Sequence, residues 1–301
     1  MNSSTADRDT PRRSLMLVSS FLLLWLAIVG SEQFQSALAY VGILSIGILH
    51  GANDLKVLLR LKGEESNVSG LRFLGLYVAL VLAVLIVFIL LPSIALPVFI
   101  LVSSYHFGEQ HFSELKGPRM TWRTLLRLGY GLFIFSTLFW TNASLAAQIM
   151  SEIADVVVSP VWFQYGFHAS LILLVSGTAG CYSSLLKQYR VVEELFLLLL
   201  FPILFSTAGL LLGFAIYFVV WHSYPSLLEQ LDYLYQDTSR KAAWRYVRES
   251  ALYWIAAIVG LGLLLYFFMD RTDELLAIVV VFLAAITVPH SLIMWRVLHR
   301  D

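Results

Sequence analysis

Long apolar stretches follow one another along most of this chain, each near the length of about 20 residues that a helix needs to cross a bilayer. We place them at 14–30, 37–58, 71–92, 94–112, 123–141, 160–183, 191–207, 208–227, 250–269 and 274–297. Only 13% of the 301 residues are charged, which is too few to cover the wetted surface of a soluble domain of this size. The sequence therefore predicts an all-α fold, a polytopic membrane bundle of about ten transmembrane helices. Residues 1–13 are expected to form a cytoplasmic N-terminal tail and residues 14–301 a single membrane-embedded helical domain.

The distribution of basic residues orients this bundle. If the N-terminus is cytoplasmic, every lysine and arginine except Arg271 falls in a segment or loop on the cytoplasmic side. Such a one-sided distribution is what the positive-inside rule describes. We therefore expect a multi-pass protein of the plasma membrane with both termini in the cytoplasm.

Composition also excludes several classes of function. Lys+Arg and Asp+Glu number 20 each, so net charge indicates no nucleic-acid partner. The single cysteine, Cys181, excludes an internal disulfide framework and any metal site built from several cysteines. No glycine-rich nucleotide-binding loop interrupts the apolar series.

Four histidines are predicted to converge inside the bundle. His50, His106, His222 and His290 lie near the inner ends, or in the inner half, of four different segments that all run from outside to inside. Side chains that project inward from facing helices at one depth are typical of a metal site in a bundle core. Imidazole is the commonest metal ligand, and an all-nitrogen set suits Fe, Cu, Zn or Ni rather than Mg or Ca.

Two carboxylates accompany these histidines. Asp54 follows His50 by four residues and Glu109 follows His106 by three, so each pair can share one face of a helix. A metal-bound histidine usually donates its second N–H to a carboxylate or a carbonyl group. Asp54 and Glu109 are therefore candidates to accept these hydrogen bonds from the histidines, or to bind the metal directly.

The other histidines have a structural interpretation, because a single histidine near the end of a membrane helix is usually a hydrogen-bonded interfacial residue. His168 lies in the outer part of its segment and His299 in the basic tail, and we expect both to be structural. His111 follows His106 by five residues and points elsewhere on an ideal helix, yet it stays open as an alternative ligand.

The sequence around the four histidines resembles a known family. The motifs are "HGANDLKVL" at His50, "YHFGEQHF" at His106, "WHSYPSL" at His222 and "TVPHSLIMW" at His290. In this order they resemble the Brp/Blh family of membrane-embedded β-carotene 15,15'-dioxygenases. The resemblance implies an Fe(2+) enzyme that cleaves the central double bond of β-carotene, or a related carotenoid, with O2 to give retinal. It maps the family's ligand motifs onto His50, His106 and His222.

One position departs from the family pattern. The family has a second histidine one turn after the position of His222, and this chain has Ser226 there. Either His290, Glu109 or His111 completes the metal site, or three histidines hold the metal alone. Two other functions stay open: a catalytically silent paralogue that binds a carotenoid or retinal, and a transporter or proton relay, which would also place ionisable residues inside the membrane.

Overall fold

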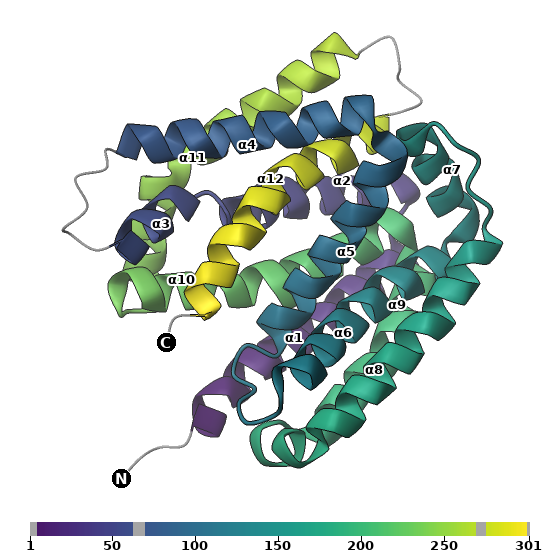
Figure 1. Cartoon of the computed structure of the whole chain (residues 1–301), viewed down its shortest axis with the longest axis vertical. Helices are drawn as coiled ribbons and strands as arrows, with labels where there is room; N and C mark the ends of the chain where they lie inside the picture. Colours follow the sequence, from purple (N-terminus) through teal and green to yellow (C-terminus); the bar gives the residue numbers. More distant parts are fainter. Residues whose placement is uncertain (1–4, 63–69, 269–274, 300–301) are drawn as a thin grey trace.

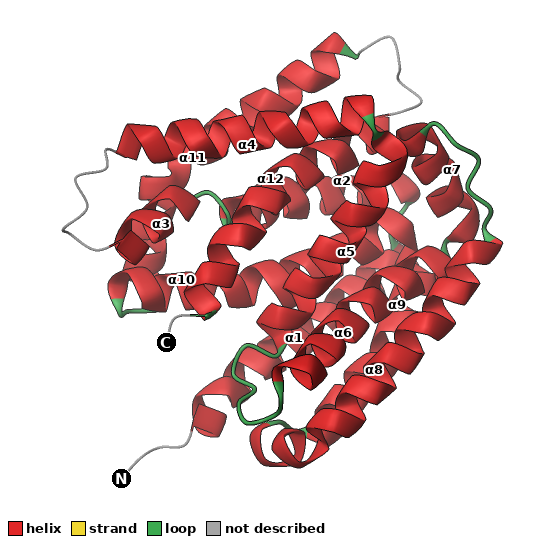
Figure 2. Ribbon diagram, viewed as in Figure 1, coloured by secondary structure: helices red, strands yellow, loops and turns green. Residues whose placement is uncertain are grey.

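The computed structural model describes residues 5–62, 70–268 and 275–299, and every regular element in these ranges is helical (Figures 1 and 2). The α-helices are α1 Thr5–Val29, α2 Glu32–Gly42, α3 Asp54–Lys62, α4 Gly70–Leu90, α5 Pro92–His111, α6 Met120–Thr141, α7 Ala143–Ala154, α8 Val161–Gln188, α9 Val191–Ile216, α10 Tyr224–Tyr235, α11 Arg240–Phe267 and α12 Leu275–Leu298. Two π-helical segments complete the series, η1 Ile43–Gly47 and η2 Tyr217–Ser223. The predicted all-α bundle is confirmed. Arg271, predicted on the outer side, and the inner residue Arg300 lie outside the described ranges.

Fewer segments than the predicted ten meet the length and apolarity that a membrane crossing requires. Within the described residues there are six: Pro11–Val29, Gly70–Leu90, Val161–Gln188, Val191–Tyr235, Arg240–Phe267 and Leu275–Leu298. The pair α6 and α7, bent by 107° at its junction, would be a seventh.

Part of this difference comes from a reversal of the chain at Gly209. This residue has φ 71°, a left-handed conformation that glycine adopts without steric cost. The rings of Phe201 and Tyr217 are 5.3 Å apart, whereas a straight helix would separate these two positions by about 24 Å. Val191–Tyr235 therefore folds back on itself, and the predicted division into 191–207 and 208–227 is confirmed.

The predicted segments 37–58 and 94–112 also contribute to the lower number of membrane-crossing segments, because the first is interrupted and the second is more polar. The predicted helix 37–58 is interrupted, because a turn at residues 50–53 separates the end of η1 from the start of α3. Gly51 and Asn53 in this turn are residue types that favour turns over helix. The predicted segment 94–112 corresponds to α5, whose last turns carry the polar motif "HFGEQH". The predicted boundary at Pro92 is confirmed, since this proline opens α5.

Helices α5 and α6 approach each other closely through glycines. A Cβ atom on Gly131 of α6 would lie 1.8 Å from the carbonyl oxygen of Ser104 on α5. On the facing helix, a Cβ atom on Gly108 would lie 1.8 Å from the carbonyl oxygen of Arg127. Small residues that allow such backbone contact are the usual basis of helix packing in membranes. This contact holds α5, and with it His106, in place.

We expect Gly131→Ala to lower the thermal unfolding temperature of the detergent-solubilised protein, because the added methyl group forces α5 and α6 apart. Overpacking of a dense contact costs about 1–3 kcal/mol. We expect a cost toward the upper end of this range, because the atom that must move is a backbone oxygen. The matched control is Gly75→Ala on α4, where a Cβ atom meets nothing within 4 Å. Equal unfolding temperatures for the two variants would contradict this packing.

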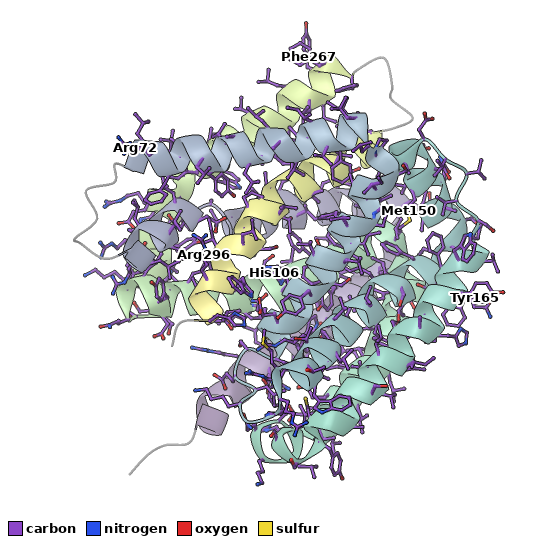
Figure 3. All side chains as sticks on the ribbon, viewed as in Figure 1. Arg72, His106, Met150, Tyr165, Phe267 and Arg296 are labelled. Carbon is purple, nitrogen blue, oxygen red and sulfur yellow. The ribbon has the colours of Figure 1, made fainter. Side chains whose placement is uncertain are left out.

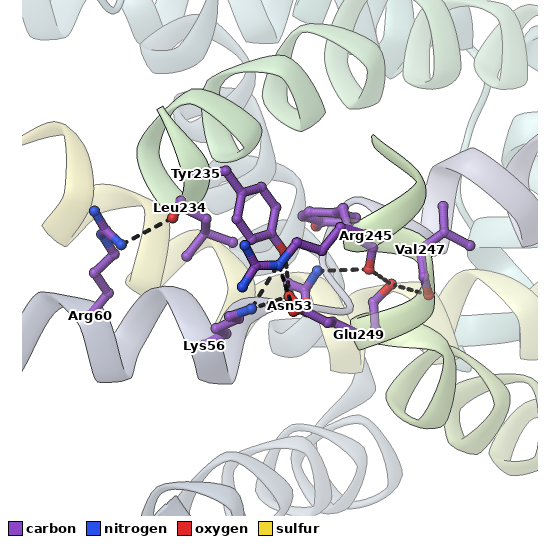
Figure 4. A network of polar contacts seen from close by, with 10 residues as sticks. Asn53, Lys56, Arg60, Leu234, Tyr235, Arg245, Val247 and Glu249 are labelled. Atoms are coloured by element: carbon purple, nitrogen blue, oxygen red, sulfur yellow. Dashed lines mark hydrogen bonds and ion pairs between the residues drawn. The ribbon is translucent and has the colours of Figure 1, made fainter. Parts of the chain in front are cut away.

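Helix α12 packs against α4, α5 and α11 (Figure 1). In that view the first turns of α1 and the last turns of α12 lie on the same, lower left side. A polar network ties α3 to α10 and α11: Lys56 and Tyr235 both contact Glu249, and Arg60 donates to the carbonyl oxygen of Leu234 at 3.0 Å (Figure 4). This network anchors the helix that follows the turn at His50.

Candidate metal centre

The structure brings together the four histidines that the sequence places at similar depth. The ring centroids are 4.7 Å apart for His50 and His290, 5.2 Å for His50 and His222, 4.9 Å for His106 and His222, and 5.3 Å for His106 and His290. All four side chains are buried, and His106 lies near the centre of the molecule in Figure 3. One ring nitrogen from each of His50, His222 and His290 lies within 4.8 Å of the other two. We name these four residues the histidine cluster.

Two of these histidines lie in or close to the π-helical segments. η1 ends three residues before His50, and η2 contains His222. Such segments are rare and frequently occur at functional sites. Glycine lets the two segments approach, because a Cβ atom on Gly47 would lie 2.7 Å from the ring of Phe218.

The hydrogen bonds of two rings define their tautomers. Nδ1 of His50 contacts the carbonyl oxygen of Gly47, and Nδ1 of His290 lies 2.8 Å from Oδ1 of Asp54. A carbonyl or carboxylate oxygen can only accept, so each Nδ1 carries the hydrogen and each Nε2 presents a lone pair. A ring held in this way is prepared to bind a metal through Nε2.

Several ring nitrogens of the cluster have no hydrogen-bond partner in the described part of the chain. They are Nε2 of His50, both ring nitrogens of His106, Nδ1 of His222 and Nε2 of His290. Buried polar atoms are nearly always paired, because an unpaired one costs roughly 1–3 kcal/mol. Unpaired nitrogens on four adjacent rings fit a bound transition metal, for which neutral imidazole is a suitable ligand.

Asp54 contacts a different histidine from the one expected. The sequence pairs it with His50 on one helical face, but the turn at residues 50–53 separates the two and places Asp54 at the start of α3. Its carboxylate accepts from His290 instead, and its second oxygen accepts from the hydroxyl of Tyr77 at 3.1 Å. Sequence reasoning missed Tyr77. The available signal was a single hydroxyl group within the apolar segment 71–92.

Glu109 and His111 do not join the cluster. Oε1 of Glu109 lies 3.3 Å from Nη1 of Arg127 and 3.6 Å from Nδ1 of His299. Nε2 of His111 lies 2.7 Å from Oε2 of Glu194, and its ring stacks on Tyr130. His168 is exposed on α8, with Nδ1 2.7 Å from the carbonyl oxygen of Gln164.

Ser226 is fully buried and belongs to a network that holds the backbone of His50. Nε2 of Gln230 donates to the carbonyl oxygen of His50 at 2.7 Å and lies 3.3 Å from Oγ of Ser226. The hydroxyl of Tyr246 lies 2.8 Å from the same carbonyl oxygen. Gln230 and Tyr246, which sequence reasoning missed, therefore support the turn that carries His50.

Two apolar cavities adjoin the cluster. The first, of about 100 Å³, is bounded by His50, His290, Asp54 and Tyr77 together with residues of α11 and α12. The second, of about 110 Å³, extends between α5, α6, α7 and α12 and is lined mainly by aliphatic and phenylalanine side chains. Phe218, Leu283 and Thr287 form part of the wall of both cavities. The structure thus places apolar space beside the histidine cluster.

Comparison with known proteins identifies the family. No curated protein and no solved structure matches the chain. The model of the family described as beta-carotene 15,15'-dioxygenase matches residues 41–297, which include all four histidines of the cluster and both cavities. The chain therefore belongs to the beta-carotene 15,15'-dioxygenase family.

Proposed function

We propose that this protein is an Fe(2+)-dependent dioxygenase that cleaves β-carotene, or a related carotenoid, with O2 to retinal inside the membrane. The observation that carries the proposal is the buried histidine cluster, with its unpaired ring nitrogens, beside two apolar cavities. Family membership supplies the reaction class.

His50, His106, His222 and His290 would hold the iron. When bound, Fe(2+) supplies the one-electron chemistry and the open coordination positions that O2 activation needs. The chain's own residues prepare the site: the carbonyl oxygen of Gly47 orients His50, and Asp54 orients His290. We assign His290 as the fourth ligand in place of the missing family histidine, because Glu109 and His111 are engaged with Arg127 and Glu194.

The two cavities would take the two halves of the carotenoid. The wall of the second cavity is almost wholly apolar, and burial of apolar surface contributes roughly 25 cal/mol per Å². Phe107 and Phe218 flank His222, with ring centroids 4.5 and 5.6 Å from the imidazole, and both line the second cavity. These rings exclude water from the reacting double bond. The basic residues predict a multi-pass protein of the plasma membrane with cytoplasmic termini. Such a protein can take a carotenoid substrate directly from the bilayer.

The direct test of the reaction class is expression in cells that make β-carotene. We expect loss of the orange colour and accumulation of retinal, measured by chromatography against cells with empty vector. If pigment stays bound to the purified protein and no retinal forms, the protein is instead a catalytically silent carotenoid-binding paralogue. If neither occurs, a transporter or proton relay becomes the better account.

A further inference from the structure

A single hydroxyl group connects the lipid-facing helix α4 to the histidine cluster. α4 has 21 residues, and only Arg72 in its first turn and Tyr77 carry polar side chains. Most of its side chains are exposed on the outside of the bundle, where lipid would surround them. Tyr77 instead turns inward and donates to Oδ2 of Asp54 at 3.1 Å.

Asp54 is held by this hydroxyl on one side and by His290 on the other. The side chain is 2% exposed, with Oδ2 accepting from Tyr77 and Oδ1 accepting from His290 at 2.8 Å. A carboxylate fixed at both oxygens cannot rotate without breaking a buried hydrogen bond. Gly51 lies next to this hydrogen bond and adds no side chain there. A Cβ atom at this position would lie 3.3 Å from Nδ1 of His290 and 3.7 Å from Oδ2 of Asp54. The orientation of the His290 ring thus depends on a chain of two hydrogen bonds that ends on α4.

We propose that Tyr77 is a positioning residue for the metal site, acting through Asp54 on His290. The proposal rests on the proposed function, since it requires that His290 binds a metal. A structural alternative is simpler: a hydroxyl inside a membrane takes any available acceptor, and the bond only fastens α4 to α3. The two readings differ in one respect. A positioning residue changes metal affinity, whereas a residue that only fastens α4 to α3 changes the stability of the fold and leaves the metal affinity of the folded protein unchanged.

The ring of Tyr77 also lines the first cavity. Tyr77→Phe keeps this ring and removes only the hydroxyl group, so cavity shape and packing are preserved. Tyr253→Phe is the matched control, because Tyr253 lines the same cavity from α11. Both variants lose one phenolic hydroxyl, and only one of them loses the contact with Asp54.

The test is anaerobic titration of the purified full-length protein with Co(2+), followed by the visible absorption of the bound ion. Removal of an outer-shell partner typically weakens metal binding by about 10–100-fold, and we expect this for Asp54→Asn. Tyr77→Phe should weaken binding by up to about tenfold and change the absorption bands, because it acts one bond further out. Tyr253→Phe should leave affinity and bands unchanged.

The double variant tests whether Tyr77 acts on the metal site through Asp54. Because residues that act through one network are not additive, Tyr77→Phe combined with Asp54→Asn should bind Co(2+) as weakly as Asp54→Asn alone. Wild-type affinity in Tyr77→Phe, or an undiminished further loss in the double variant, would overturn the positioning role. A wild-type protein that binds Co(2+) and makes retinal while Tyr77→Phe is unaffected refutes this inference alone. A wild-type protein that binds no metal refutes the inference and the metal assignment together.

Discussion

Replacement of His222 by alanine is expected to remove bound iron and to lower retinal formation by more than about 100-fold. Loss of a residue that only hydrogen-bonds to a metal ligand costs about 10–100-fold, and loss of a ligand should cost more. His222 lies beside both His50 and His106, with ring centroids 5.2 and 4.9 Å away, so its removal takes a proposed ligand from the histidine cluster. Alanine at His50 or His106 should have the same effect. Iron content by elemental analysis and retinal yield in carotene-producing cells measure the two losses.

His168→Ala is the matched control for this prediction. It removes the same side chain from α8, where His168 is exposed and bonded to a backbone carbonyl oxygen. Iron content and retinal yield should equal those of the wild type. Single alanine variants at His50, His106 and His222 that each keep a full iron would show that the metal lies elsewhere.

The second large effect is a contrast between a variant of the proposed ligand His290 and a variant of Glu109, which belongs to a buried ion pair. His290→Ala should reduce iron content as much as His106→Ala while the protein stays folded. Glu109→Gln should keep the iron content per folded chain and lower the free energy of unfolding, because it leaves the charge of Arg127 buried without its partner. Breaking a buried ion pair in this way typically costs about 3–5 kcal/mol. Iron per folded chain and the free energy of unfolding should therefore change independently in the two variants.

The opposite pattern would reassign the fourth ligand. If Glu109→Gln lost iron at unchanged stability and His290→Ala kept it, the carboxylate would belong to the metal site. Full iron and full retinal yield in His290→Ala would favour a site of three histidines.

Much of the fold was predictable because hydrophobic run length decides where a membrane helix forms. The boundaries at Pro92 and near Gly209 followed from run length, and the backbone at both positions explains why: proline opens a helix, and Gly209 adopts a left-handed conformation. The turn at residues 50–53 was missed, since the apolar pattern continues through it on both sides. Run length alone cannot distinguish one continuous helix from two short helices joined inside a bundle.

The proximity of the four histidines was predictable from depth, but their partners were not. Asp54 and His290 are 236 residues apart in sequence, and the carbonyl oxygen of His50 is held by Gln230 and Tyr246, which follow it by 180 and 196 residues. Local spacing contains no information on such contacts. Ser226 illustrates the limit: the family pattern marks it as a missing ligand, and the structure places its hydroxyl beside Gln230 in the support of His50.

The central claim is that the histidine cluster holds one iron. Its most direct test is X-ray absorption at the iron edge on the purified full-length protein loaded anaerobically with Fe(2+). We predict one iron per chain, with nitrogen neighbours and the outer-shell scattering of at least three imidazole rings. An iron surrounded by oxygen neighbours without imidazole scattering, or a protein that retains no iron, would contradict the claim.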